Sequence, residues 1–142
     1  MPIRPENRAR YPKNWPQISA EIRGRAGNRC EECGVANGEL GARWHDGTWL
    51  PAIPDGDNGI RLQWPRPGEY RLFRHGGIAA DLKIVRIVLT VAHLDHTPEN
   101  CDPGNLRAWC QRCHNRYDAA ARRAGIRERM RVMMATTDLF DA

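Results

Sequence analysis

The densest hydrophobic stretch of this 142-residue chain is "DLKIVRIVLTVAH", which ends at His93. Its β-branched side chains favour extended backbone and predict a strand that ends near this histidine. "PQISAEIRGRAG" has Ile18 and Ile22 on one face and Gly27 as a stop, which predicts a short helix. "NLRAWCQRCHNRYDAAARRAGIRERMRVMM", from Asn105 onward, consists mostly of good helix formers and predicts a long helix.

The other segments show no long periodic pattern. Residues 1–16 contain four prolines and predict an extended arm. Residues 34–77 are rich in glycine, proline and tryptophan and predict short, irregular strands. The Asp-Gly pair of "HDGT" predicts a hairpin turn there, because it tolerates the positive φ that tight turns need. Trp44, Trp49 and Trp64 either stack on bases or pack a small core, and packing is the favoured interpretation.

The length of the chain predicts a single domain with a modest core. No apolar run approaches the roughly 20 residues of a membrane span, and the first residues lack the apolar stretch of a secretory signal. We therefore expect a cytoplasmic protein with no membrane partner. The net charge is +5, and the excess positive charge lies in the first 29 residues and the last 41. This clustering favours a polyanionic partner.

Arginines recur along the long predicted helix. Arg112, Arg116 and Arg123 can share one face, with Arg122 beside them. Such a stripe is either solvated surface or a row of contacts to nucleic-acid phosphates. An arginine fork suits bidentate phosphate contacts better than a lysine does.

Four of the five cysteines form two C-x-x-C pairs, Cys30 with Cys33 and Cys110 with Cys113. Disulfides are disfavoured in the cytoplasm, and two such pairs match the tetrahedral four-thiolate site of structural zinc. A closed site of this kind stabilises the fold and leaves no position for a reacting water. Cys101 has no such partner and is interpreted as a bystander.

Histidines and polar residues gather between the predicted strand and the long helix, in "AHLDHTPENCDPGNL" and "CQRCHN". This arrangement resembles the HNH endonuclease family. The motif of that family has a first histidine at a strand end, a central asparagine before leucine and a last histidine in the following helix, often within two C-x-x-C pairs. The resemblance covers about residues 92–118 together with the first cysteine pair, and it leaves residues 34–85 uncovered.

The resemblance allows two registers for the first histidine. In one, His93, Asp95 and Asn105 follow the family form "H-x-D-x-x-P-x-N" and the central "NL", so His93 is the base. In the other, Asp95 is a metal ligand and His96 is the base. The first register is favoured, although Ala92 stands where many members have an acid.

The resemblance implies a role for each residue. His93 would take the proton of the attacking water, because a neutral imidazole accepts a proton at physiological pH. His114, with Asp95 or waters, would hold Mg²⁺ or Mn²⁺ at the leaving 3′ oxygen. Asn105 would brace the loop. Asn115 and Asp118 are candidate neighbours of this ion.

The sequence thus predicts an α+β fold: one small zinc-stapled domain over residues 1–142. Its parts are the basic arm (1–16), a variable β-rich insert (34–85) and a ββα-metal core with its helix (86–134). The expected activity is metal-dependent hydrolysis of DNA, leaving 5′-phosphate ends. Expected partners are DNA and either a second copy of the chain or DNA-processing proteins of phages or mobile elements. The alternatives are a non-catalytic zinc module that binds nucleic acid and, less favoured, a nuclease acting on RNA.

Overall fold

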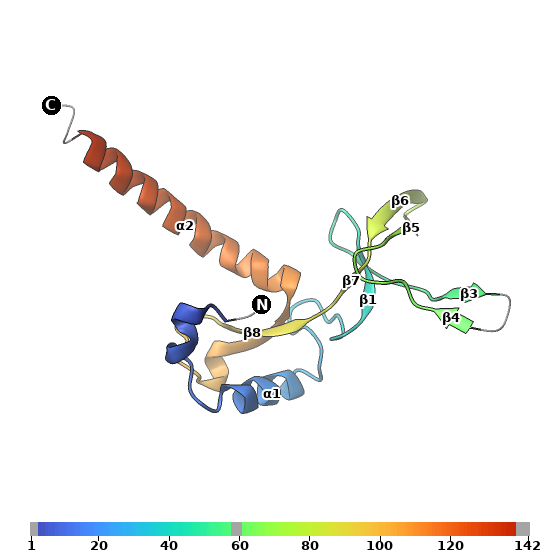
Figure 1. The fold of residues 1–142 in the computed structure, drawn as a ribbon, viewed down its shortest axis with the longest axis horizontal. Coiled ribbons are helices and arrows are strands. Elements are labelled where there is room, and N and C mark those ends of the chain that lie inside the picture. The colour runs from blue at the N-terminus through green and yellow to red at the C-terminus, as the bar shows by residue number, and fades with distance from the viewer. Residues whose placement is uncertain (1–2, 58–60, 139–142) are drawn as a thin grey trace.

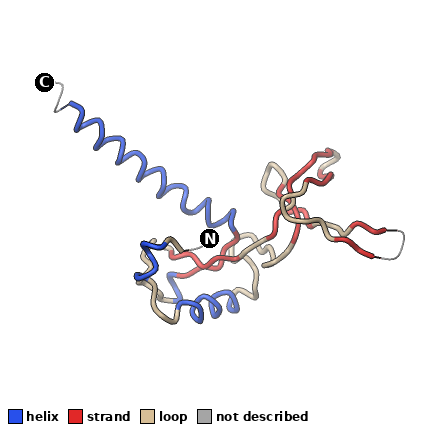
Figure 2. Tube along the Cα trace, viewed as in Figure 1, coloured by secondary structure: helices blue, strands red, loops and turns tan. Residues whose placement is uncertain are grey.

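The structure is a computed structural model of the chain, and it describes residues 3–57 and 61–138. Helices and strands both contribute, so the predicted α+β class is confirmed (Figure 1). No helix in these two ranges is long and apolar enough to cross a membrane. Figure 2 shows the helices at one end of the molecule and most of the short strands at the other.

An antiparallel hairpin and the helix that follows it form the centre of the fold. Strand β8 (Leu89–His93) pairs with β9 (Leu106–Cys110) so that His93 lies opposite Leu106. Helix α2 (Gln111–Asp138) starts directly after β9 and extends away from the body (Figure 1). The strand predicted to end near His93 is therefore confirmed.

The start predicted for the long helix is wrong by six residues. We placed it at Asn105, but residues 106–110 form β9. Leu106, Ala108 and Cys110 are completely buried, and the strand is fully paired with β8. Burial and ladder hydrogen bonds outweigh the modest helix propensity of this stretch.

Helix α1 (Trp15–Arg25) matches the short helix predicted from the sequence, and Gly27 follows its end with a φ of 62°. It covers one face of the hairpin, where Ile22 packs with Leu106 and Ala108. The opposite face carries a second cluster, which includes Leu89, Trp109 and three of the four paired cysteines. The hairpin is thus the middle layer of the core.

The N-terminal arm is not fully extended as predicted. Residues Pro5–Arg10 form a 3-10 helix, η1. Arg10 makes an ion pair of 2.7 Å with Glu99, and the Tyr11 ring lies 5.6 Å from that of His93. These contacts to the β8–β9 loop fold the arm back over the hairpin.

The segment between α1 and β8 forms short strands. Strands β2 (Trp49–Pro51), β1 (Leu40–Arg43) and β7 (Val85–Arg86) make a small sheet. Two further hairpins project from it, β3 (Asp55–Asp57) with β4 (Arg61–Gln63) and β5 (Tyr70–His75) with β6 (Ile78–Lys83) (Figure 1). The predicted Asp-Gly turn is confirmed, because Gly47 joins β1 to β2 with a φ of 92°.

The three tryptophans of this segment have different environments. Trp49 packs against the cysteine-containing core cluster, and Trp44 lies against the rings of His45 and His75. Trp64 is 58% exposed. Core packing was therefore the wrong interpretation for Trp64.

Candidate active site and metal centre

The four paired cysteines converge in space. The Sγ atoms of Cys30, Cys33, Cys110 and Cys113 all lie within 4.8 Å of one another, and Cys33 and Cys110 are 3.7 Å apart. Four thiolates around one zinc at 2.3 Å would lie about 3.8 Å apart, so this group could hold a structural metal ion such as zinc. It joins the start of α2 to a turn 80 residues earlier in the chain.

The surroundings act differently on the cysteines of the cluster: burial raises the pKa of Cys110 and of Cys113, whereas the pKa of Cys33 is lowered. The Arg43 guanidinium lies 3.6 Å from Cys33 Sγ and 3.5 Å from Cys110 Sγ. Partial burial opposes ionisation of Cys33, but hydrogen bonds from Val35 and Arg43 outweigh it and lower the pKa of Cys33 to about 6. A cation beside a four-thiolate site offsets part of its excess negative charge.

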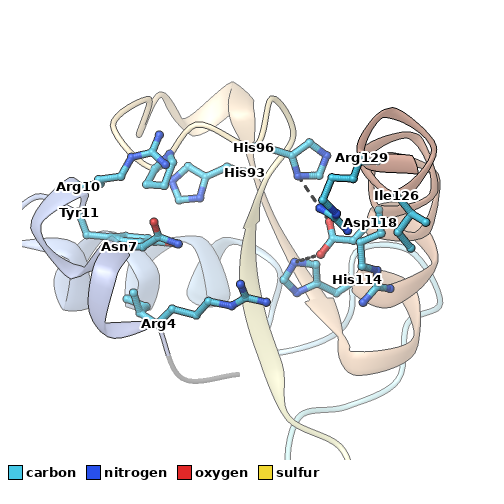
Figure 3. Close-up of a pocket in the computed structure, with 15 residues that line it drawn as sticks. Arg4, Asn7, Arg10, Tyr11, His93, His96, His114, Asp118, Ile126 and Arg129 are labelled. Carbon is cyan, nitrogen blue, oxygen red and sulfur yellow. Dashed lines mark ion pairs between the residues drawn. The ribbon is translucent and has the colours of Figure 1, made fainter. Parts of the chain in front are cut away.

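A separate cavity of about 780 Å³ lies between α2 and residues 3–11, which are called the N-terminal segment from here on. Three histidines line it: His93 from β8, His96 from the following loop and His114 from the first turn of α2. Figure 3 shows His93 on the side of the N-terminal segment and His114 with Asp118 on the side of α2. The structure thus brings together three of the five predicted catalytic residues, whereas Asn105 and Asp95 are not among the described residues that line this cavity.

Both ring nitrogens of His114 have polar neighbours. Thr90 Oγ1 lies 2.8 Å from Nδ1 and 3.4 Å from the Trp109 carbonyl, and the tautomer of the ring decides whether the hydroxyl donates to Nδ1 or accepts from it. His114 Nε2 faces the Asp118 carboxylate at 3.3 Å. Burial also lowers the pKa of His114, although Asp118 opposes this, so the ring is neutral near pH 7.

At 3.3 Å the Asp118 carboxylate accepts a hydrogen bond if His114 Nε2 carries the proton; if Nδ1 carries it, Nε2 offers a lone pair beside the carboxylate. Imidazole nitrogen and carboxylate oxygen are ligands of divalent metals, and one ion about 2.1 Å from each would span the gap. With Nε2 unprotonated, His114 and Asp118 could therefore serve as two ligands of a divalent ion. The sequence predicted Asp95 as the second ligand beside His114.

Asp95 organises the loop instead. Its carboxylate accepts hydrogen bonds from the side chains of Asn100 at 2.8 Å and Asn105 at 2.9 Å and from the backbone of Thr97 at 2.8 Å. These bonds lower the pKa of Asp95 to about 2. Every hydrogen bond that the Asp95 carboxylate accepts comes from a group of this loop or from Asn105 at its end. Asp95 is therefore not paired with His114.

Asn105 occupies the centre of the same network. Its side-chain nitrogen donates to Asp95 and to the Asn100 carbonyl, and its side-chain oxygen accepts from the Asp95 backbone at 3.1 Å. Its own carbonyl accepts from the backbone of Leu94. One residue thus ties the start of β9 to the loop that follows His93.

His93 lies under aromatic side chains. Its ring stacks on Trp15 with 5.0 Å between the ring centroids and also contacts Tyr11. The residue is only 8% exposed to solvent. Burial lowers the pKa of His93, against the raising effect of Asp95 and Glu99. The imidazole is therefore neutral and held in one orientation, with Nε2 3.9 Å from Cys101 Sγ.

His96 has a different environment. It adopts a left-handed backbone with a φ of 58°, and its ring stacks on Tyr117 at 5.5 Å. Its Nδ1 lies 3.6 Å from the second oxygen of Asp118. Asp118 therefore bridges His96 and His114.

The predicted arginine stripe divides between different sides of α2. Arg122 lines the histidine cavity, whereas Arg116 lies beside Trp109 and Tyr117 and Arg123 beside Arg127. Arg112 extends toward Gly47 in the β1–β2 turn.

Several residues of the cavity were missed from the sequence. The spacing of His114 and Asp118, four apart on a helix, could have indicated that they share a face. Nothing in the sequence indicated that Arg4 and Tyr11 of the N-terminal segment reach the cavity, or that Trp15 at the start of α1 stacks on His93.

Comparisons of the chain with models of known protein families, with curated proteins and with solved structures find no match. Function therefore has to be argued from the chemistry of the site itself.

Proposed function

We propose that this protein is a metal-dependent endonuclease that hydrolyses DNA phosphodiester bonds, as the resemblance to the HNH family implies. The observation that carries the proposal is the opposition of His114 Nε2 and Asp118, 3.3 Å apart, in a cavity that also contains a buried, neutral His93. A divalent-ion site and a base in one cavity are the two groups that phosphodiester hydrolysis needs.

In this proposal His93 is the general base. Its unprotonated nitrogen takes a proton from water as the water oxygen attacks phosphorus. The bond from phosphorus to the 3′ oxygen breaks, which leaves a 5′-phosphate and a 3′-hydroxyl that takes its proton from solvent. The stack on Trp15 and the contact with Tyr11 hold the imidazole in place and keep bulk water from its face.

His114 and Asp118 would hold a divalent ion, Mg²⁺ or Mn²⁺. Such an ion supplies charge stabilisation at the leaving oxygen and the phosphate. In this proposal Thr90 Oγ1 accepts from His114 Nδ1, 2.8 Å away, and His96 contacts the other oxygen of Asp118 at 3.6 Å. Asn105 and Asp95 maintain the loop between His93 and His96.

The four cysteines would hold zinc as a structural ion. Three of them lie in the core cluster with Leu89 and Trp109, and none of the four is among the residues that line the histidine cavity. Zinc there joins the start of α2 to the rest of the domain, and so positions His114 without taking part in the reaction.

The second candidate is a zinc-stabilised module that binds nucleic acid without cutting it. The observation in its favour is that His93 is only 8% exposed, beneath Tyr11 and Trp15. A general base must contact the attacking water, and the rings of Tyr11 and Trp15 restrict the access of water to His93. This restriction favours a module that does not cut.

A plasmid assay separates the two. The zinc-loaded protein should convert supercoiled DNA to nicked or linear DNA only with added Mg²⁺ or Mn²⁺. His93→Ala should abolish cutting and retain DNA binding, whereas the control His75→Ala, on the β5–β6 hairpin, should cut normally. DNA binding without cutting in any divalent ion would favour the module. Loss of cutting in His96→Ala alone would transfer the role of base to His96.

A further inference from the structure

Arginines line both walls of the histidine cavity. Arg4 and Arg10 come from the N-terminal segment, and Arg122 and Arg129 come from α2. Figure 3 shows Arg4 pointing from the side of the N-terminal segment into the cavity, with Arg129 on the side of α2. Asp118 is the only acidic residue among the described residues that line it. The cavity is therefore strongly positive, apart from the carboxylate proposed to hold an ion.

Three of the four guanidinium groups have no carboxylate partner among the described residues. Arg10 is paired with Glu99 at 2.7 Å. Arg122 donates only to the Asn115 carbonyl of its own helix. The side chains of Arg4 and Arg129 make no ion pair or hydrogen bond in the described part of the chain. Unpaired cations that face one cavity are suited to an anionic ligand.

The cavity side of α2 forms one continuous face. His114, Asp118, Ala121, Arg122, Gly125 and Arg129 all line the cavity, at the spacing of one helical face. Between Arg122 and Arg129 the cavity is lined by Gly125 and Ile126. A Cβ added to Gly125 would meet only Arg129, at 3.8 Å. A phosphate group can therefore approach the helix at Gly125, beside the Ile126 side chain.

The length of this face matches several nucleotides. Arg122 lies eight residues and Arg129 fifteen residues beyond His114, which is about 12 Å and about 22 Å along the helix axis. Since one strand of a DNA duplex rises about 3.4 Å per base pair, the face from His114 to Arg129 spans about six base pairs.

We infer that the N-terminal segment and the cavity side of α2 are two walls of a groove that holds the phosphate backbone of duplex DNA. Arg4 contacts phosphates beside the scissile one, and Arg122 and Arg129 contact phosphates progressively further along the duplex. This inference rests on the proposed function and deepens it, because it assigns the path of the substrate. It also gives the N-terminal segment a defined place in the groove, where the sequence predicted an extended basic arm and only a general preference for a polyanionic partner.

The test measures binding of a 20-base-pair duplex to the full-length, zinc-loaded protein without Mg²⁺ or Mn²⁺. Fluorescence anisotropy at several salt concentrations gives both the affinity and its salt dependence. Arg4→Ala and Arg129→Ala should each weaken binding roughly tenfold, as loss of a charge-assisted contact does. Each should also reduce the slope of log K against log[salt] by about one.

Arg123→Ala and Arg127→Ala are the matched controls. Both residues lie on the same helix, border a different pocket and carry the same charge. Each of these variants should change the affinity less than twofold, because the effect of removing a charge that does not contact the DNA is screened by salt. Gly125→Leu is a second test, since it keeps the net charge and fills the space in front of the helix; it should weaken binding while the circular dichroism spectrum is retained.

The outcomes separate this inference from the proposed activity. Equal losses in the Arg123 and Arg127 variants, or unchanged binding in the Arg4 and Arg129 variants, would overturn the groove whether or not the protein cuts DNA. If the predicted binding pattern holds but no divalent ion supports cutting, the groove stands and the nuclease proposal fails. Tighter binding of single-stranded DNA or of RNA with the same arginine dependence would overturn the assignment to duplex DNA.

Discussion

His114 Nε2 and Asp118 Oδ2 lie 3.3 Å apart, one helical turn from each other on α2. Thr90 Oγ1 lies 2.8 Å from the opposite ring nitrogen of His114, and with the proton on that nitrogen the pair offers two ligand atoms to a cation. Asp118→Asn keeps the shape of the side chain and removes its charge. We expect it to lose Mn²⁺ binding at this site, measured by electron paramagnetic resonance, and to lower the cleavage rate about 100-fold or more.

Glu128→Gln is the control for that variant, because Glu128 is on the same helix and pairs with Arg131 at 2.9 Å. It should bind Mn²⁺ and cut DNA as the wild type does. Normal Mn²⁺ binding in Asp118→Asn would show that the ion lies elsewhere.

The loop held by Asn105 predicts a different kind of defect. Asn105→Ala removes the hydrogen bonds to Asp95 and Asn100. We expect the free energy of unfolding to fall by about 1–3 kcal/mol, measured by urea denaturation. Cleavage should slow while the affinity for Mn²⁺ stays unchanged, since His114 and Asp118 are not touched. An equal loss of Mn²⁺ affinity would place Asn105 or Asp95 in the ion site.

The environment of His93 predicts the pH dependence of cleavage. Burial under Trp15 lowers the pKa of His93, so the base stays neutral to a lower pH than an exposed histidine would. Cleavage should therefore persist below pH ~6.5 and fall only as His93 takes up a proton. Trp15→Ala exposes the ring, raises its pKa toward the ordinary value and should move the acid limb of the pH–rate profile upward. A profile that does not move would argue against His93 as the base.

The same pKa shift affects stability. A histidine with a lower pKa when folded binds fewer protons in the folded state than in the unfolded state at acid pH. At pH values above the pKa of the unfolded state, His93 is neutral in both states and does not affect stability. As the pH falls from there through the pKa of the folded state, the unfolded state takes up the proton more readily and the folded state loses stability. We expect the free energy of unfolding to decrease over this window, and to decrease less in His93→Gln, as measured by urea denaturation at a series of pH values.

The cysteine cluster predicts dependence of the fold on metal. If zinc binds the four thiolates, its binding contributes about 10–16 kcal/mol to folding, as in small zinc domains. Cys110→Ser should therefore lose zinc and most of its cooperative thermal transition, followed by circular dichroism and by metal analysis. Cys101→Ser should keep both, because Cys101 lies outside the cluster. Cooperative unfolding at the wild-type temperature in a zinc-free protein would contradict a structural role for the metal.

The local elements could be predicted where one physical effect dominates. The β-branched run ending at His93, the short helix around Ile22 and the Asp-Gly turn all formed as expected. The pairing of the two C-x-x-C motifs was also predictable, because their spacing is a ligand pattern and all four thiols meet in the structure. In each of these cases the deciding interactions lie within a few residues or repeat a known ligand spacing.

Other features were decided by contacts between distant segments. Residues 106–110 have a helical composition but pair with β8, since Leu106 and Cys110 are buried between two core clusters. Asp95 has the composition of a metal ligand but is occupied by Asn100 and Asn105.

The residues around the histidines show the same division. The sequence by itself determined which titratable side chains cluster near the end of β8 and the start of α2. Only the tertiary structure decided which of them meet, because that depends on the register of the hairpin and on the rotation of α2 against it. It folded the N-terminal segment and the start of α1 over His93 through the Arg10–Glu99 pair and the Trp15 stack. Those contacts join residues almost 80 or more positions apart, and no local pattern encodes such a distance.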